Sequence, residues 1–187
     1  RDDLVSTLRH LREHCCIDGA FFQDMIHAGL NPYLTLQIAQ AMLREGLPGF
    51  EEPRDAAAAL ASDTGQWPEA VHPATGGGCM GDGQHMWASA EWLLITANML
   101  VRTEGDCLLL CSGLTPGWLP DGADITFGPA WTVHGKLTLH VSRHAGTIAV
   151  SREADWHGAA PAVQIALPGT EPAPVDRHHL ELVALRL

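Results

Sequence analysis

The apolar residues of this chain change their spacing near Gly105, and this change constrains the fold more than any other feature. Before that glycine, apolar residues recur every three or four positions, as between Leu4 and Leu8, which is typical of amphipathic helices. After it, apolar and polar residues alternate, which is typical of strands with one buried face. The sequence therefore predicts an α+β protein, with a helical part over residues 1–104 and an antiparallel β part over residues 105–187.

The clearest helix of the first part is predicted over residues 31–46. Asn31 can cap it, Pro32 occupies the first helical position, and Gly46 follows its end. These are the residue types that favour the two ends of a helix. A second, alanine-rich helix is predicted over residues 53–62. The rest of the first part is expected to be helical as well.

A third helix, predicted over residues 83–102, is apolar almost all the way round. A helix of this kind is expected to be buried on every side. This chain has too few other helices to cover every side of the third helix. We therefore expect further helices on the N-terminal side, in a longer protein of which this chain is a fragment.

The β part contains a predicted hairpin. Residues 131–143 alternate so that Val133 and Leu137 face the core, and residues 144–146 form a tight turn into a second strand over residues 147–153. Further strands are predicted over residues 107–111, 162–169 and 178–187.

The overall charge limits the partners of the chain. The formal net charge is −11, so a nucleic acid backbone or an anionic membrane surface is not expected to bind. No apolar stretch is long enough to span a bilayer. Cys107 and Cys111 fall roughly 13 Å apart along one predicted strand, which is too far for a disulfide. Reduced cysteines and a cytoplasmic location are the expected interpretation.

Residues 65–87 bring together the groups that carry chemistry. Glu69 follows Trp67 and Pro68, and five glycines lie between residues 76 and 83. Glycine permits a close approach of the backbone to a ligand. A carboxylate beside an indole suits a glycosidase, because the acid can move a proton while the ring stacks on a sugar.

Other kinds of site fit these residues poorly. The loop "GGGCMGDG" lacks the spacing of a phosphate-binding loop and is equally typical of a tight turn with Asp82 as the helix N-cap. His72, Cys79, Asp82 and His85 lack the regular spacing of metal ligands, so no metal site and no cofactor are expected. A core position for His85 remains an open alternative.

The segments "QWPEA" and "GDGQHMWASAEWLL" together resemble the last part of the six-hairpin glycosidases, the (α/α)6-barrel enzymes, and within them the bacterial α-L-rhamnosidase-like proteins. The positions that carry the resemblance are Trp67, Glu69, His85, Trp87, Ala88, Glu91, Trp92 and Leu93. The resemblance implies the end of an (α/α)6 barrel followed by an antiparallel C-terminal β-sandwich.

The same resemblance implies that Glu69 is the catalytic base, which activates water in an inverting hydrolysis, and that His85 lies at the sugar site. Trp67, Asp82 and Trp87 complete the predicted substrate-binding set, and the place of Trp87 in the apolar helix also favours a core position for its ring. The catalytic acid of such enzymes lies in an earlier hairpin, so it is expected outside this chain.

The expected partners are a carbohydrate substrate and either a second copy of the chain or the missing N-terminal part of the barrel. Without Lys or Arg between residues 65 and 87, hydrolysis is favoured over phosphorolysis. The alternative is a non-catalytic carbohydrate-binding or structural module on a degenerate barrel.

Overall fold

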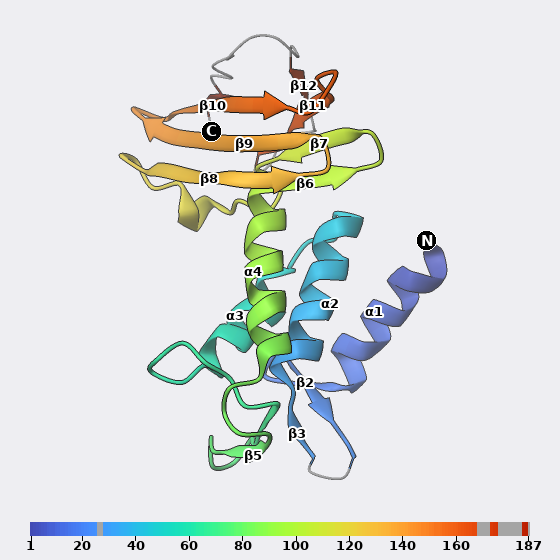
Figure 1. Cartoon of the computed structure of the whole chain (residues 1–187). Coiled ribbons are helices and arrows are strands. Elements are labelled where there is room, and N and C mark those ends of the chain that lie inside the picture. The colour runs from blue at the N-terminus through green and yellow to red at the C-terminus, as the bar shows by residue number, and fades with distance from the viewer. Residues whose placement is uncertain (26–27, 168–172, 176–184, 187) are drawn as a thin grey trace. The chain divides into compact units, whose positions relative to one another are not determined.

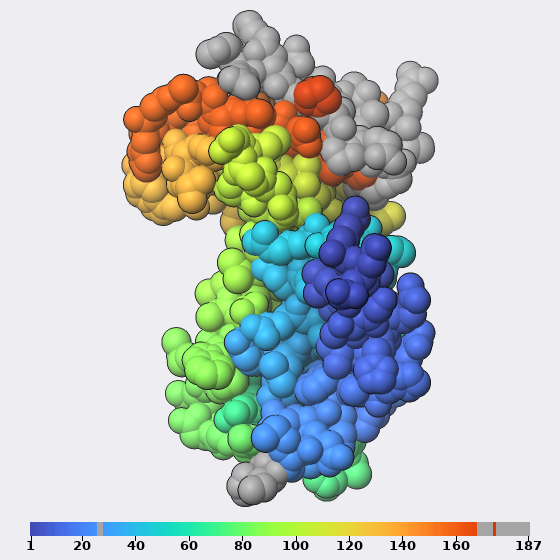
Figure 2. Space-filling view, turned by 90° about the vertical axis from the view of Figure 1, so that its right-hand side faces the viewer, coloured from blue at the N-terminus to red at the C-terminus, as the bar shows by residue number. Residues whose placement is uncertain are grey.

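A computed structural model of the chain describes residues 1–25, 28–167, 173–175 and 185–186. These residues form a mixed α+β structure with two compact units, Arg1–Ile95 and Thr96–Leu187. The first unit holds α1 (Asp2–His14), β1 (Cys16–Ile17), β2 (Ala20–Gln23), β3 (Gly29–Leu30), α2 (Pro32–Glu45), α3 (Glu51–Ala59), β4 (Ala70–Val71), β5 (Gly78–Met80) and the start of α4 (Met86–Leu100). In Figure 2, α1 in dark blue lies against α2 in lighter blue on one face of this unit.

The helix α2 confirms the end signals found in the sequence. The Asn31 side chain accepts a hydrogen bond of 2.9 Å from the backbone N–H of Leu34. Pro32 is the first helical residue, and Gly46 ends the helix with a φ of 66°, which is the left-handed conformation that glycine adopts without strain. Leu36 is completely buried on the inner face of this helix.

The expectation of a wholly helical first part is wrong. The five strands β1 to β5 form a small sheet in that order. It is tied to α2, because the hydroxyl of Thr35 accepts a hydrogen bond of 2.9 Å from the backbone N–H of Phe21. The Asn31 amide also donates to the Gln23 side chain at 2.8 Å. Strands of two to four residues are too short to show a period of two in the sequence.

The described residues do not bury the third helix on every side, as the small number of helices in this chain led us to expect. In α4, Ala88 and Ile95 are completely buried, but Trp87 is 63% and Leu93 is 70% exposed. Met86 and Leu94 are exposed as well. An apolar composition all round shows that each face of the helix tolerates burial. It does not show that this chain covers each face.

The second unit contains two four-stranded sheets (Figure 1), with the strand orders β13-β10-β9-β8 and β12-β11-β7-β6. Their strands are β6 (Val101–Glu104), β7 (Cys107–Leu110), β8 (Asp124–Thr132), β9 (Gly135–His144), β10 (Thr147–Trp156), β11 (Ala162–Ile165), β12 (Ala173–Val175) and β13 (Leu185–Arg186), and a short 3-10 helix covers Pro116–Trp118. Both sheets contribute to one core: Leu108, Leu110, Leu137, Leu139, Val141, Ile148, Val150, Val163 and Ile165.

Most strand pairs in this unit are antiparallel, as expected, but β7 and β11 are parallel. The predicted turn over residues 144–146 is confirmed between β9 and β10, where Ala145 and Gly146 both have positive φ. Residues 131–143 do not form one strand, because a turn at Val133 and His134 divides them between β8 and β9. Val133 is therefore 76% exposed and does not face the core. The strand predicted over residues 178–187 falls mainly outside the described residues.

None of the helices in the described part of the chain combines the length and the apolar character that a membrane span requires. All five cysteines are free thiols, and Cys111 is completely buried directly after β7. Burial raises the pKa of the Cys111 thiol to about 12. This cysteine is therefore protonated and shielded in the folded protein.

We expect Cys111 to resist a thiol reagent at pH 8 in the native chain and to react when the chain is unfolded. Thiolates react and thiols do not, so labelling should be slower by at least about a hundredfold than in urea. Peptide mapping after timed labelling with iodoacetamide measures this. Equal rates in the two states would contradict the burial.

Candidate functional site

The residues singled out in the segment 65–87 come together through their backbones. The N–H of Glu69 donates a hydrogen bond of 3.0 Å to the carbonyl of Met80 in β5. The N–H of His85 donates to the carbonyl of Trp67 at 2.7 Å. The backbone of Trp67 to Glu69 therefore lies between the end of the glycine-rich loop and the start of α4.

Glu69 lies directly before β4 and is half-buried. Among the described residues, none forms a hydrogen bond or ion pair with its carboxylate. Gly81 passes so close that a Cβ on it would lie 3.3 Å from the Cβ of Glu69, and its φ is +77°. Glycine at this position thus lets the loop pack against the backbone of the acid, whose carboxylate stays without a partner in this part of the structure.

Trp67 is placed as a structural residue. It is only 4% exposed, and its indole N–H donates a hydrogen bond of 2.8 Å to the carbonyl of Ala57 in α3. Its ring lies 5.7 Å from the ring of Trp92, centroid to centroid. A cavity of about 340 Å³ lies beside them, lined by Ala58, Ala61, Gly65, Trp67, Ser89, Trp92 and Leu93. Trp67 fixes the backbone before Glu69 and is itself almost completely buried.

His85 and Trp87 belong to an aromatic cluster with Tyr33. The rings of Tyr33 and Trp87 lie 5.3 Å apart, and those of His85 and Trp87 lie 5.8 Å apart. Tyr33 meets His85 edge to face at 6.2 Å. These distances fall in the range of attractive ring contacts. Tyr33 stands in the first turn of α2, next to Pro32, and no role was predicted for it. Tyr33 is the single tyrosine of the chain, and this was the sequence signal that could have singled it out.

The imidazole of His85 carries an unpaired atom. Its Nδ1 is buried and has no hydrogen-bond partner in the described structure. Leaving a buried polar atom unpaired costs about 1 to 3 kcal/mol. A ligand hydroxyl at this nitrogen would remove that cost, while the backbone N–H of the same residue stays bonded to Trp67.

Asp82 is exposed. The sequence suggested it as the N-cap of α4, and it does not have that position. Its carboxylate accepts a hydrogen bond of 3.0 Å from the backbone N–H of Gln84, and the helix begins later, at Met86. Asp82 therefore closes a turn ahead of the helix, and its carboxylate remains accessible to solvent.

Residues 72 to 77, which lead into the glycine-rich loop, use backbone N–H groups internally. Gly76 donates to the carbonyl of His72 at 2.9 Å, and His72 donates to the carbonyl of Gly77 at 2.8 Å. The N–H groups of Ala74 and Thr75 both point at Nδ1 of His72. A phosphate cradle needs such N–H groups free, so the loop geometry does not favour phosphate. No three metal-ligating side chains gather anywhere among the described residues.

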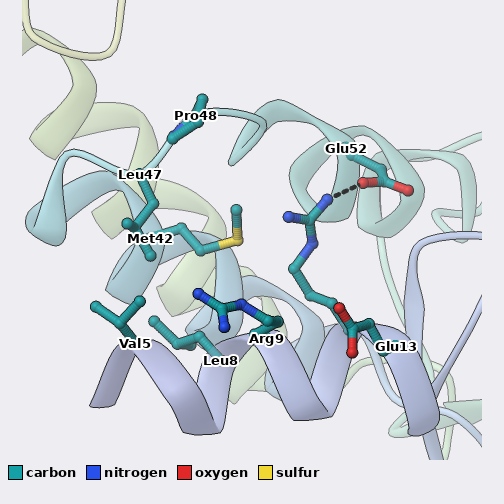
Figure 3. A pocket seen from close by; sticks show the side chains of 9 residues that line it. Val5, Leu8, Arg9, Glu13, Met42, Leu47, Pro48 and Glu52 are labelled. Atoms are coloured by element: carbon teal, nitrogen blue, oxygen red, sulfur yellow. Dashed lines mark hydrogen bonds and ion pairs between the residues drawn. The ribbon is translucent and has the colours of Figure 1, made fainter. Parts of the chain in front are cut away.

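A second cavity, of about 470 Å³, lies between α1 and α2 and was not anticipated from the sequence. Figure 3 shows Arg9 and Glu13 reaching into it from α1, opposite Met42 and Pro48. Arg12 forms an ion pair with Glu52 at its edge. The spacing of Arg9 and Arg12 along α1 was the sequence signal that could have indicated this cavity. The cavity is lined by both apolar and charged side chains, which gives it no defined chemistry.

Comparison of the chain with protein-family models, with curated proteins and with solved structures gives no match. The assignment of a function to this site therefore rests on the residues and their geometry.

Proposed function

We propose that this chain is the C-terminal portion of a six-hairpin glycoside hydrolase, with Glu69 as the base that activates water. The observation that carries the proposal is that Glu69, His85 and Trp87 come together at the N-terminal end of α4, the head of this helix. The carboxylate of Glu69, which has no partner among the described residues, follows a backbone segment that is hydrogen-bonded to His85. The imidazole of His85, whose Nδ1 has no partner among the described residues, stands beside the exposed ring of Trp87.

Each group has a distinct role in this proposal. Glu69 accepts a proton from the attacking water, which is the task of the base in an inverting glycosidase. His85 binds a sugar hydroxyl through Nδ1. Trp87 and Tyr33 offer ring surface to the apolar face of the sugar, and Asp82 accepts a hydrogen bond from a hydroxyl. Trp67 holds the backbone of the base in place and does not touch the sugar.

The fold supports the same proposal at a finer level. We infer that α1 to α4 are the last helices of an (α/α)6 barrel and that the two sheets form its C-terminal β-sandwich. The exposed apolar residues of α4 then pack against N-terminal hairpins of the full-length protein. Several large apolar residues exposed on one helix favour a contact with another protein segment, and a second copy of the chain would cover them in the absence of those hairpins.

The catalytic acid has no candidate among the described residues. Asp18 and Asp24 are both exposed, away from the head of α4 in sequence, and nothing in their contacts distinguishes them. The acid then comes from an earlier hairpin. The lack of a candidate acid among the described residues favours one other function, a carbohydrate-binding module without turnover. Sugar affinity with no hydrolysis in the full-length protein would identify that function.

The test is hydrolysis of aryl glycosides, beginning with rhamnosides, by the full-length protein, together with a His85→Ala variant. We expect this variant to bind the sugar about tenfold more weakly, or roughly 1.4 kcal/mol, because one hydrogen bond to a hydroxyl is lost. The maximal rate should change much less, since the base remains. A His85→Ala variant with unchanged affinity would contradict the role of Nδ1.

A further inference from the structure

The outward face of the sheet β13-β10-β9-β8 carries an indole that the proposed hydrolytic site does not use. Trp131, near the end of β8, is 69% exposed. Exposing a tryptophan of this area to water is unfavourable, and nothing in the core of the unit requires a tryptophan at this place. The residue lies in the unit Thr96–Leu187, whereas Glu69 and His85 lie in Arg1–Ile95.

The indole is held in place by its cross-strand neighbours. Trp131 pairs with Lys136 of β9, and Lys136 pairs with Asp155 of β10. Directly paired residues share one face of a sheet, so these three side chains form a row. The ammonium of Lys136 lies 4.8 Å from the centroid of the indole, a cation–π contact. His157 directly follows β10, and its ring centroid lies 6.1 Å from the centroid of the indole.

Polar groups surround the indole. Asp155 and His157 are exposed, and the next row of the same face pairs Thr138 with Glu153. Hydrogen-bond donors and acceptors therefore border one apolar ring. The cores of protein–protein interfaces are depleted in lysine and acidic residues, so this face suits a protein partner poorly. A pyranose has the complementary form, because its C–H groups make an apolar face and its hydroxyls form a polar rim.

We propose that Trp131, Lys136, Asp155 and His157 form an indole platform that binds a pyranose unit of a polysaccharide. The sugar ring displaces the ammonium of Lys136 from the face of the indole and stacks there. Lys136 then donates to a hydroxyl or ring oxygen at the edge of the sugar, and Asp155 accepts from a hydroxyl. The platform is independent of Glu69 and involves no chemical step.

Affinity electrophoresis of the whole 187-residue chain through gels containing xylan, galactomannan or polygalacturonate tests this platform. We expect at least one of the three polymers to retard the chain. Trp131→Ala should weaken that retardation at least about tenfold, and Lys136→Gln should weaken it to a smaller extent. Val133→Ala is the matched control, because Val133 is an exposed apolar residue in the turn that follows β8 and should leave retardation unchanged.

Circular dichroism of each variant establishes that the fold is retained, which is expected because Trp131 is mostly exposed. Migration unaffected by all three polymers would overturn the proposal, and so would equal retardation of Trp131→Ala and the unchanged chain. Size-exclusion chromatography adds a further outcome. If Trp131→Ala abolishes a self-association of the chain, then a second copy covers the indole and the platform is not a sugar site.

Discussion

Replacing Glu69 by glutamine in the full-length protein is expected to reduce hydrolysis of its glycoside by about 10² to 10⁴-fold, the usual contribution of a general base. The amide has the shape of the carboxylate but does not accept a proton from water. Sugar binding should stay within about tenfold, or roughly 1.4 kcal/mol, because Glu69 has no partner among the described residues that the substitution would leave unsatisfied. Turnover and sugar titration on the same preparation measure the two effects separately.

Asp63→Asn provides the control for this experiment. It makes the same change of charge in an exposed acid a few residues upstream, and we expect it to leave turnover unchanged. If Glu69→Gln retained near-native turnover, Glu69 would not be the base. If affinity fell as far as the rate, Glu69 would hold the substrate and would not activate water.

Gly135→Ala is expected to lower the free energy of unfolding of the second unit by about 3 kcal/mol or more. Gly135 begins β9 with a φ of +139°, a conformation that costs other residues about 1 to 3 kcal/mol. A Cβ at this position would collide with the backbone carbonyl of Asp155 and would lie 2.8 Å from the Cα of Trp156. Both are backbone atoms of a paired strand, and overpacking of this kind costs about 1 to 3 kcal/mol.

Gly158→Ala is the matched substitution. Gly158 lies a few residues beyond Asp155 and has no positive φ, and a Cβ added to it would meet no other atom within 4 Å. Its replacement should therefore change stability by less than about 0.5 kcal/mol. Urea denaturation followed by fluorescence gives both values. A Gly135→Ala variant as stable as Gly158→Ala would show that β9 and β10 are not paired in the register described.

The free energy of unfolding of the second unit is expected to depend on pH above pH 9 because of Cys111. The thiol ionises near 9.0 when unfolded, and its pKa is about 12 when folded, so the unfolded state loses its proton first as the pH rises. The stability that Cys111 contributes is therefore complete below pH 9 and is lost progressively between pH 9 and 12.

The parts of the fold that local chemistry determines were predictable from the sequence. Asn31, Pro32 and Gly46 set the ends of α2 through their own backbone preferences. The turn at Ala145 and Gly146 followed from the alternation on either side of it. Long, regular elements with distinct end residues carry their own signals, so tertiary contacts were not needed to find them.

The parts that depend on distant contacts were not predictable. The strands β1 to β5 are too short for a period, and they pair across residues that are far apart in the chain. Trp67 was expected to bind sugar, but its N–H bonds to the carbonyl of Ala57 and its side chain is almost completely buried. Tyr33 joins His85 and Trp87 only because the sheet brings the start of α2 to the head of α4. Spacing within one segment contains no information about such neighbours.

The parallel pairing of β7 and β11 has a consequence for the order in which the second unit assembles. The hairpin of β6 and β7 and the meander of β8, β9 and β10 each form between neighbouring segments, so they can close soon after synthesis. β11 pairs with β7 only after the whole meander has been made, and distant pairings of this kind slow folding. Until then β7 presents an open edge to other chains. The chain is therefore most prone to aggregation between the synthesis of β7 and the pairing of β11 with it.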